Sequence, residues 1–292
     1  MSPRHLVRRS GEIALLTPAA LPADGIRRRA VVDEEAGAVH TGFAICELDA
    51  GGASVPHVHS FEESVFVLEG EPVIETTEAA YRLRPGDYGV LPVGVPHTWR
   101  SEGPARWAEM AAPQPRAGHD GDTQVVAPWA SPGSVPVDVR DPRVRSFGHI
   151  EPENMDPAKQ TQDMLAVSAS MRTALLVYSG ITLKMMVDTD LDAQLSTMFM
   201  VQNDAGGGAG PHDHPFEETY LIVEGEVDGV FDGTPYHLTV GDVGWAGAGC
   251  VHSFSNPGPG HVRWLETQAP QPPARHSYRF ERDWVYLRET LG

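Results

Sequence analysis

The sequence predicts an all-β protein built from two copies of one domain. Its 292 residues suit two domains of ordinary size, and hydrophobic residues make up 41% of the chain, enough for each half to bury a core. Glycine and proline are numerous, at 30 and 25 residues, which favours short strands joined by turns over long helices. The third observation is an internal repeat, which makes the two halves copies of one fold.

The repeat runs without a gap through most of each copy. Phe61-Glu62-Glu63 matches Phe216-Glu217-Glu218, a shift of 155 residues (216 − 61). Further on, two extra residues enter the second copy, and the match resumes with Trp107 and Trp264 at a shift of 157 (264 − 107). Apolar runs at 65–68 and 220–223 end at Glu-Gly turns and predict equivalent strands.

The segment between the copies has a different composition. Residues 116–155 are rich in proline, glycine and aspartate and predict a linker. Asp156-Pro157 is typical of an N-cap followed by proline at the first helical position, and predicts a short helix to about Ser170. We therefore expect a first domain over residues 1–130, a linker with a short helix over 131–170, and a second domain over 171–292. Aromatic residues in the tail from Arg275 predict that it packs onto a domain.

Composition excludes several classes of function. The formal net charge of −18 repels a phosphate backbone, so we expect no nucleic-acid partner. No run of about 18 apolar residues is present and the start lacks a signal-peptide pattern, so we expect no membrane segment. The two cysteines, Cys46 and Cys250, fall at non-equivalent places in the repeat. A disulfide framework is not expected, and a cytoplasmic location is the default.

Three histidines and a glutamate recur at the same spacing in both copies, a pattern typical of a metal site. On a strand, residues two apart share a face, so a His-x-His pair projects two imidazoles together, and a glutamate four residues on keeps the same parity. The third histidine lies 34 residues past the glutamate in each copy (97 − 63 and 252 − 218) and must come from another strand. Neutral imidazoles and one carboxylate suit a divalent transition metal. The predicted ligands are His57, His59, Glu63 and His97, and then His212, His214, Glu218 and His252.

These residues carry a resemblance to the cupin family. Both copies match the spacing of the two cupin motifs, except that Gly247 stands where the pattern has proline and Ser101 where it has asparagine. The strings are Gly51-x5-His57-x-His59-x3-Glu63-x6-Gly70, Gly86-x5-Pro92-x-Gly94-x2-His97-x3-Ser101, Gly206-x5-His212-x-His214-x3-Glu218-x6-Gly225 and Gly241-x5-Gly247-x-Gly249-x2-His252-x3-Asn256. The resemblance implies a bicupin: two conical antiparallel jelly-roll barrels, each with a metal inside one mouth.

Side chains that share the parity of the ligands are expected to line the two pockets. In the first copy these are Phe61, Val65 and Trp99, and in the second they are Phe216, Tyr220, Ile222 and Phe254. On the flanking strands, Gln202 and one of Arg263 and Glu266 are candidates for the second pocket, and an outward-facing salt bridge is the alternative. Because the second copy has the phenol of Tyr220 and keeps Asn256, we expect it to be the principal active site.

Cupins host many reactions, so the resemblance specifies the fold better than the chemistry. Similarity to quercetinase-like cupins implies a dioxygenase that binds a diketone, catechol or flavonol and dioxygen at the metal, with Glu218 or Glu63 as the base. The alternative is a non-redox isomerase, decarboxylase, lyase or amidohydrolase in which Tyr220 transfers a proton. A second alternative is a non-catalytic cupin that binds a small molecule. Fe2+ or Mn2+ is favoured, and Ni2+, Cu2+ or Zn2+ also fits the donor set. A monomer and a homodimer are both compatible with two barrels in one chain.

Overall fold

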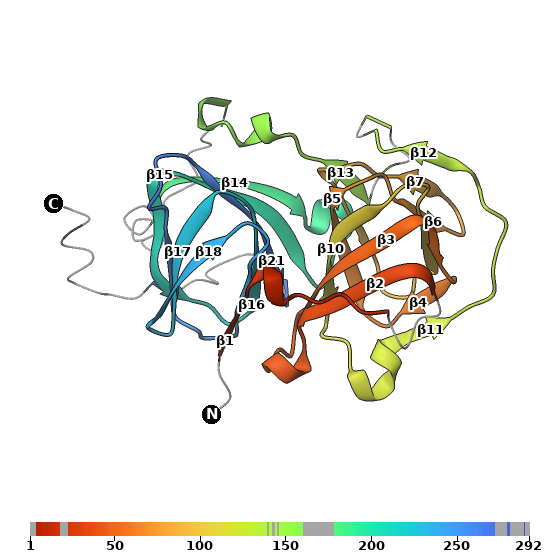
Figure 1. The fold of residues 1–292 in the computed structure, drawn as a ribbon, viewed down its shortest axis with the longest axis horizontal. Helices are drawn as coiled ribbons and strands as arrows, with labels where there is room; N and C mark the ends of the chain where they lie inside the picture. Colours follow the sequence, from red (N-terminus) through yellow and green to blue (C-terminus); the bar gives the residue numbers. More distant parts are fainter. Residues whose placement is uncertain are drawn as a thin grey trace. The chain divides into compact units, whose positions relative to one another are not determined.

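The computed structural model describes residues 4–17, 23–138, 140–141, 144, 146–159, 178–271, 279–280 and 289. These residues are almost entirely β: they form two curled, mainly antiparallel sheets, of twelve and ten strands, and their short helical turns are 3-10 helices. Each sheet belongs to one of two compact units, which we call the first and second barrels (Figure 1). The predicted all-β fold with two barrels is confirmed.

The first barrel comprises Ile13–Glu151 and Met186–Met198. Its strand order is β12-β7-β6-β9-β3-β10-β5-β8-β13, with β2 paired to β3, and β4 paired to β9 and β11. The strands are β2 (Ala23–Val32), β3 (Gly42–Ser54), β4 (His57–His59), β5 (Glu62–Glu69), β6 (Val73–Thr76), β7 (Ala80–Arg82), β8 (Asp87–Leu91), β9 (His97–Arg100), β10 (Ala105–Ala112), β11 (Thr123–Val125), β12 (Ser134–Pro136) and β13 (Phe147–His149). Its 3-10 helices are η2 (Glu34–Ala36), η3 (Ala117–Asp122) and η6 (Thr189–Leu191).

The second barrel comprises Met1–Glu12, Pro152–Met185 and Phe199–Gly292. Its strand order is β1-β19-β16-β21-β15-β20-β17-β18, and β14 and β22 also pair with β15. The strands are β1 (His5–Arg8), β14 (Tyr178–Val187), β15 (Thr197–Asp213), β16 (Glu217–Glu224), β17 (Glu226–Phe231), β18 (Thr234–Thr239), β19 (Val243–Ala246), β20 (His252–Ser255), β21 (Val262–Ala269) and β22 (Arg279–Phe280). Its 3-10 helices are η1 (Ser10–Glu12), η4 (Pro152–Met155) and η5 (Pro157–Lys159).

Strand alternation builds the same core in both barrels. On β10 the buried ring of Trp107 faces the first core, and on β21 the ring of Trp264 faces the second. The motif-one glycines, Gly70 and Gly225, both have positive φ, at 76° and 74°, a conformation that glycine adopts without strain. A Cβ atom there would also collide with the backbone of a neighbouring loop. Glycine therefore ends β5 and β16 at equivalent positions of the two barrels.

The domain boundaries differ from those predicted at residues 130 and 170. The first residues of the chain belong to the second barrel, because β1 pairs antiparallel with β19. Residues 186–198 belong to the first barrel, where the buried carboxylate of Glu62 accepts hydrogen bonds from the backbone N–H groups of Gln194, Leu195 and Ser196. Neither segment is held by contacts that the repeat reveals, so sequence matching alone does not place them.

The predicted linker helix falls mostly on residues that the structure does not describe. Asp156 does cap its first turn, since its carboxylate accepts a hydrogen bond from the backbone N–H of Ala158 at 2.9 Å. The described turn, Pro157–Lys159, is a 3-10 helix, and the stretch from 160 to Ser170 lies outside the described residues. In the tail, β22 pairs with β15, and most other residues beyond Gln271 are likewise outside the described part.

Candidate metal centres

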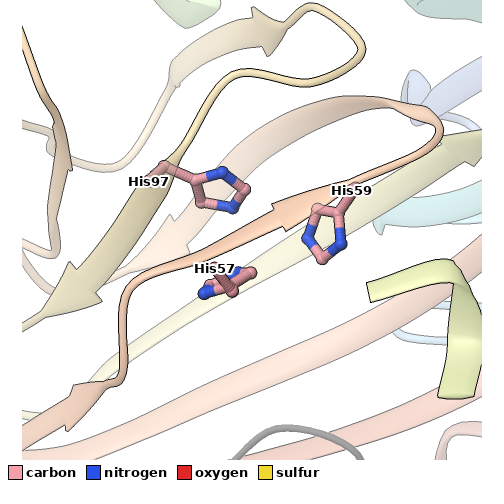
Figure 2. Close-up of side chains that lie close together, drawn as sticks. All are labelled: His57, His59 and His97. Carbon is pink, nitrogen blue, oxygen red and sulfur yellow. The ribbon is translucent and has the colours of Figure 1, made fainter. Parts of the chain in front are cut away.

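The four predicted ligands of the first copy meet inside the first barrel. His57 and His59 lie on β4, Glu63 on β5 and His97 on β9. One ring nitrogen from each histidine lies within 4.8 Å of the others, and Figure 2 shows the three rings converging. The Oε2 atom of Glu63 lies 3.3 Å from His59 Nε2 and 3.2 Å from His97 Nε2. The spacing of the motif therefore translates into one compact donor set.

In the second barrel the donor atoms of His214, Glu218 and His252 lie within 4.8 Å of one another, and His212 lies beside His252. Glu218 Oε2 lies 2.8 Å from His214 Nε2 and 3.3 Å from His252 Nε2, and the ring of His212 lies 4.3 Å from that of His252. His214 follows the last residue of β15, so its ring is 6.2 Å from His212, whereas the rings of His57 and His59 are 4.8 Å apart on β4. Parity predicted that His212 and His214 lie on one regular strand. The structure differs, because His214 lies beyond the end of β15.

Hydrogen bonds fix which nitrogen of each imidazole faces the centre. In five of the six histidines Nδ1 lies 2.7–3.0 Å from a backbone carbonyl oxygen. Because a carbonyl only accepts, Nδ1 carries the proton and Nε2 keeps its lone pair for a metal. His59 differs, since its Nδ1 lies 2.8 Å from the hydroxyl of Thr123. The carbonyl pairs are His57 with Val55, His97 with Val95, His212 with Gly210, His214 with Phe216 and His252 with Cys250.

The donor atoms fit a divalent cation. In the first barrel, Glu63 Oε2 and His97 Nε2 are buried and lie at ion-pair distance, yet neither has a hydrogen-bond partner of good geometry within the described chain. Buried polar atoms without a hydrogen bond are costly unless another group satisfies them. A cation at the point where the nitrogen and oxygen lone pairs converge satisfies both atoms. Three imidazoles and one carboxylate leave one or two positions for a substrate on a five- or six-coordinate metal.

Burial keeps one histidine of each site in the metal-binding form. Burial lowers the pKa of His57 to about 3, and the nearby rings of His97 and His59 contribute in the same direction. Burial likewise lowers the pKa of His212 to about 3, with His252 as the next cause. Both imidazoles are therefore neutral near pH 7, as a metal ligand must be.

Both glutamates are ionised. Burial alone would raise the pKa of Glu63, but the nearby imidazoles, His97 above all, hold it well below its usual range. Glu218 behaves in the same way, and His214 has the largest lowering effect on its pKa. Each site thus presents one negative charge to a divalent cation, which leaves a net positive centre that favours an anionic ligand.

In the second barrel, further polar side chains surround Glu218. The hydroxyl of Tyr220 donates to Glu218 Oε2, and the amide of Gln268 donates to Glu218 Oε1 at 2.6 Å. Glu266 pairs with Tyr220 in the β16–β21 register and accepts a hydrogen bond from Trp264 Nε1 at 2.8 Å. Burial, and then the charge of Glu218, raise the pKa of both Glu266 and Tyr220 well above their usual values. Tyr220 therefore keeps its proton near neutral pH, and the shift at Glu266 favours its protonated form.

The first barrel lacks this arrangement around its glutamate. Ala111 lies opposite Glu63 in the β10–β5 register, where Gln268 lies opposite Glu218 in the second barrel. Val65 occupies the place of Tyr220 and is fully buried. Because neither side chain has a polar hydrogen, no counterpart of the two hydrogen bonds to Glu218 is available to Glu63 from these positions.

Glu109 on β10 also has different hydrogen-bond partners from its counterpart on β21, Glu266. Arg28 donates to Glu109 Oε1 through Nε at 3.0 Å and Nη2 at 2.8 Å, and the thiol of Cys46 donates to Glu109 Oε2 at 3.2 Å. The indole N–H of Trp107 is left without a hydrogen-bond partner among the described residues, whereas its counterpart Trp264 binds Glu266. At the place of Arg28, the repeat puts Leu183 in the second copy. The two barrels thus share their ligands but differ in the groups behind them.

The apolar residues predicted for the pockets lie against the ligands or deeper in the cores. Phe61 stacks on His59 and Phe216 on His214, with ring centroids 4.2 and 3.9 Å apart. Phe254 lies 4.8 Å from the ring of Tyr220. Ile222 belongs to the core of the second barrel, and Val65 and Trp99 belong to that of the first.

Gln202 and Arg263 are not brought to the second site. Arg263 Nε donates to Gln202 Oε1 at 2.7 Å, and its Nη1 donates to the exposed Glu224. Arg263 alternates along β21 with Trp264 and Glu266, whose side chains face the interior, so it lies on the other face. Of the candidates on these strands it is Glu266 that reaches the site, because it has the parity of Trp264.

Asn256 binds backbone oxygens and the two cysteines are buried, and none of the three is a metal ligand in the predicted sets. The amide of Asn256 donates to the backbone oxygens of Asn203 and Asp204 on β15 and of Gly260, so it ties the loop after β20 to that strand, and none of these bonds involves a ligand. Its presence therefore no longer favours the second copy as the active one. Cys46 and Cys250 are both free and buried.

Comparisons with known proteins agree with the fold and the motifs. A cupin domain model matches residues 44–111 and again residues 199–267. Similar solved structures include a formate complex of oxalate decarboxylase from Lactobacillus farciminis, with 16% sequence identity, a TM-score of 0.63, and coverage of 96% of this chain and 89% of that chain. The Bacillus subtilis oxalate decarboxylase at pH 4.6 gives 14% identity, a TM-score of 0.62, and coverage of 98% and 80%. No curated protein matches the chain.

These matches report on family and fold. In the part of the chain that the structure describes, no helix has the length and apolar character needed to cross a bilayer. The two cupin matches each contain one complete set of metal-ligand positions, and each falls within one barrel of a fold shared over nearly the whole chain with two-barrel proteins. The chain is a bicupin, a member of the cupin superfamily.

Proposed function

We propose that this bicupin is a metal-dependent lyase that removes CO2 from a small carboxylic acid, with the second barrel as its principal active site. The observation that carries the proposal is the pair of proton-bearing groups, Tyr220 and Glu266, beside the metal ligand Glu218. When the C–C bond of a carboxylate breaks, its electron pair stays on the remaining carbon and must be protonated. An enclosed acid beside the metal is the group that such a reaction needs.

Each residue has a defined task in this proposal. His212, His214, His252 and Glu218 would hold the divalent cation, which supplies a Lewis acid that binds the substrate carboxylate and withdraws electron density. The exclusion of water is provided by burial, since His214 and Tyr220 are 0% exposed and Glu218 is 1% exposed. Tyr220 delivers a proton to the carbon that loses CO2, and solvent restores that proton after product release. The enclosed site favours a small substrate.

The comparisons support this non-redox proposal more than the dioxygenase that the sequence had suggested. Similar solved structures include oxalate decarboxylases, and one of them holds formate. At 13–16% identity that likeness reports the fold, and it suggests small mono- and dicarboxylates such as oxalate as the first compounds to assay. The donor set also suits an oxygen-activating metal, so dioxygen consumption is the measurement that separates the two reactions.

The test uses the full chain reloaded separately with Mn2+, Fe2+, Co2+ and Zn2+. CO2 release and dioxygen uptake are recorded together on a panel of small carboxylic acids, diketones, catechols and flavonols. The proposal predicts CO2 release without dioxygen uptake, loss of activity in His212→Ala, and activity in His57→Ala. Stoichiometric dioxygen uptake, or loss of activity in His57→Ala alone, would overturn it.

A further inference from the structure

We infer that Gln268 is a positioning residue of the second metal centre: it locks the orientation of Glu218 and gives this centre a higher metal affinity than the first. The inference rests on the metal centres of the proposed function but not on the reaction assigned to them. It concerns a residue outside both cupin motifs, on a strand that supplies no metal ligand.

The geometry gives the two oxygens of Glu218 separate tasks. Oε1 accepts the amide hydrogen bond of Gln268 at 2.6 Å, while Oε2 accepts the hydroxyl of Tyr220 and lies 2.8 Å from His214 Nε2. Gln268 and Tyr220 are 3% and 0% exposed, so water does not replace either donor. Rotation of the carboxylate would break both hydrogen bonds at once. Oε2 is therefore held towards the imidazoles before any cation arrives.

The position of Gln268 follows from strand pairing. β16 and β21 run antiparallel, and their register places Gln268 directly opposite Glu218 on the interior face of the barrel. Two residues along β21, Glu266 faces Tyr220 in the same row. The amide is thus supplied by a rigid strand within a sheet, which is the kind of support that keeps a ligand oriented to a fraction of an ångström.

The first barrel is a natural control. Ala111 lies directly opposite Glu63 in the matching register, and its methyl group cannot donate a hydrogen bond. Val65 replaces the phenol, so Glu63 lacks both of the side chains that orient Glu218. Glu63 Oε2 has no hydrogen-bond partner within the described residues. Its carboxylate has greater freedom to turn, and part of the free energy of metal binding at the first centre is spent on ordering it.

Loss of a partner that orients a metal ligand typically weakens metal binding by about 10- to 100-fold. We therefore expect the second centre of the unmodified chain to bind a cation more tightly than the first. Removal of the Gln268 amide should weaken the second centre by about that factor, because Glu218 then has the orientational freedom of Glu63. An amide introduced at position 111 should act in the opposite sense on the first centre.

The experiment measures the two centres separately with Co2+, which reports both affinity and ligand geometry through its visible absorption. His57→Ala leaves only the second centre, and His212→Ala leaves only the first. Chelator-competition titrations with Co2+ are run on each full-length single-centre protein. In the His57→Ala protein they are repeated with Gln268→Met, which preserves volume without a donor, and with Gln268→Ala. In the His212→Ala protein they are repeated with Ala111→Gln. Circular dichroism and thermal melts confirm that each variant is folded.

The inference predicts four results. The second centre binds Co2+ more tightly than the first; folded Gln268→Met loses about 10- to 100-fold in affinity and shifts its Co2+ spectrum; and Gln268→Ala behaves likewise. Ala111→Gln tightens the first centre and moves its spectrum towards that of the second. Unchanged affinity and spectrum in both folded Gln268 variants would overturn the inference. So would a first centre that binds Co2+ as tightly as the second. Because no substrate is used, either result is independent of whether the chain is a decarboxylase.

Discussion

Replacement of Tyr220 by phenylalanine removes one oxygen from the centre of the second site and leaves the ring in place. The ring is fully buried and packs 4.8 Å from Phe254 and 5.9 Å from Phe231, so the barrel core should be retained. The lost group is the hydroxyl that donates to ionised Glu218. A hydrogen bond to a charged partner contributes about 1.5–3 kcal/mol, so we expect the substitution to lower the free energy of unfolding by an amount in that range.

Because Tyr220 delivers the proton in the proposed reaction, its replacement by phenylalanine should also slow catalysis. General acid catalysis contributes typically about 10²- to 10⁴-fold, so kcat of Tyr220→Phe should fall at least 100-fold with little change in KM. A fall of 100-fold corresponds to about 2.7 kcal/mol of transition-state stabilisation. The assay is steady-state CO2 release by the metal-loaded chain, with metal content measured on the same samples to exclude loss of the cation.

A matched variant separates this role from a general effect of losing a tyrosine hydroxyl. Tyr236 also lies in the second barrel, and its hydroxyl is hydrogen-bonded to His5 Nε2 at 3.0 Å, away from the ligands. Tyr236→Phe should retain kcat within about twofold. If Tyr220→Phe, fully loaded with metal, keeps kcat within about threefold of the unmodified chain, Tyr220 is not the acid, and the role assigned to it is wrong.

Three further predictions follow from single contacts. His57→Ala and His212→Ala should each bind one divalent cation fewer per chain than the unmodified protein, measured by elemental analysis; the same stoichiometry in all three would contradict the two-centre assignment. Arg28→Leu should lower the free energy of unfolding by about 2 kcal/mol, because it strips Glu109 of its charged partner, and Glu109→Gln in the same chain should restore part of the loss in urea titrations. Burial would raise the pKa of Asp242, but backbone N–H groups and an arginine outweigh it and lower that pKa, so its contribution to stability is present above its unfolded value of about 3.9 and is lost as the pH falls through the lower, folded value. The stability difference between the unmodified chain and Asp242→Asn should therefore be constant near pH 6 and shrink below about pH 4; a difference that grows on acidification would contradict that sign.

The sequence predicts the fold and the ligand sets because both depend on short-range patterns. His57 and His59 are two residues apart, and their parity with Glu63 places all three on one wall of a barrel. The repeat then transfers the same reasoning to the second copy. Where the pattern meets a strand end, as at His214, the alternation fails locally, but the ring still reaches the site.

The side chains that hydrogen-bond the metal ligands are placed by pairing between strands that lie far apart in the sequence. Gln268 is 50 residues from Glu218 in sequence, and only the β16–β21 register brings the two together. Its parity with Trp264, and the contrast with Ala111 in the repeat, are signals in the sequence, but neither specifies which residue lies opposite. The choice between Arg263 and Glu266 stayed open for the same reason, because the parity of β21 was not tied to a residue known to face inward.

The N-terminal segment shows a second limit. β1 joins the second barrel through backbone pairing with β19, and side chains then anchor it: Arg4 binds Asp232, and Arg9 binds Asp242. The repeat does not include residues 4–9, so no match in the second copy indicates a partner for them. Backbone pairing is nearly independent of side-chain identity, which is why a segment's sheet partner is hard to infer from its own residues.

The central claim is that the second barrel releases CO2 from a small carboxylic acid without consuming dioxygen. Its most direct test is simultaneous recording of CO2 and dissolved oxygen with the metal-loaded His57→Ala chain, in which only the second centre is complete. The account predicts CO2 release from at least one small carboxylic acid, a flat oxygen trace, and loss of the signal when Tyr220→Phe is added. One dioxygen consumed per substrate, or no turnover of any carboxylic acid while a complete first barrel in His212→Ala remains active, would contradict it.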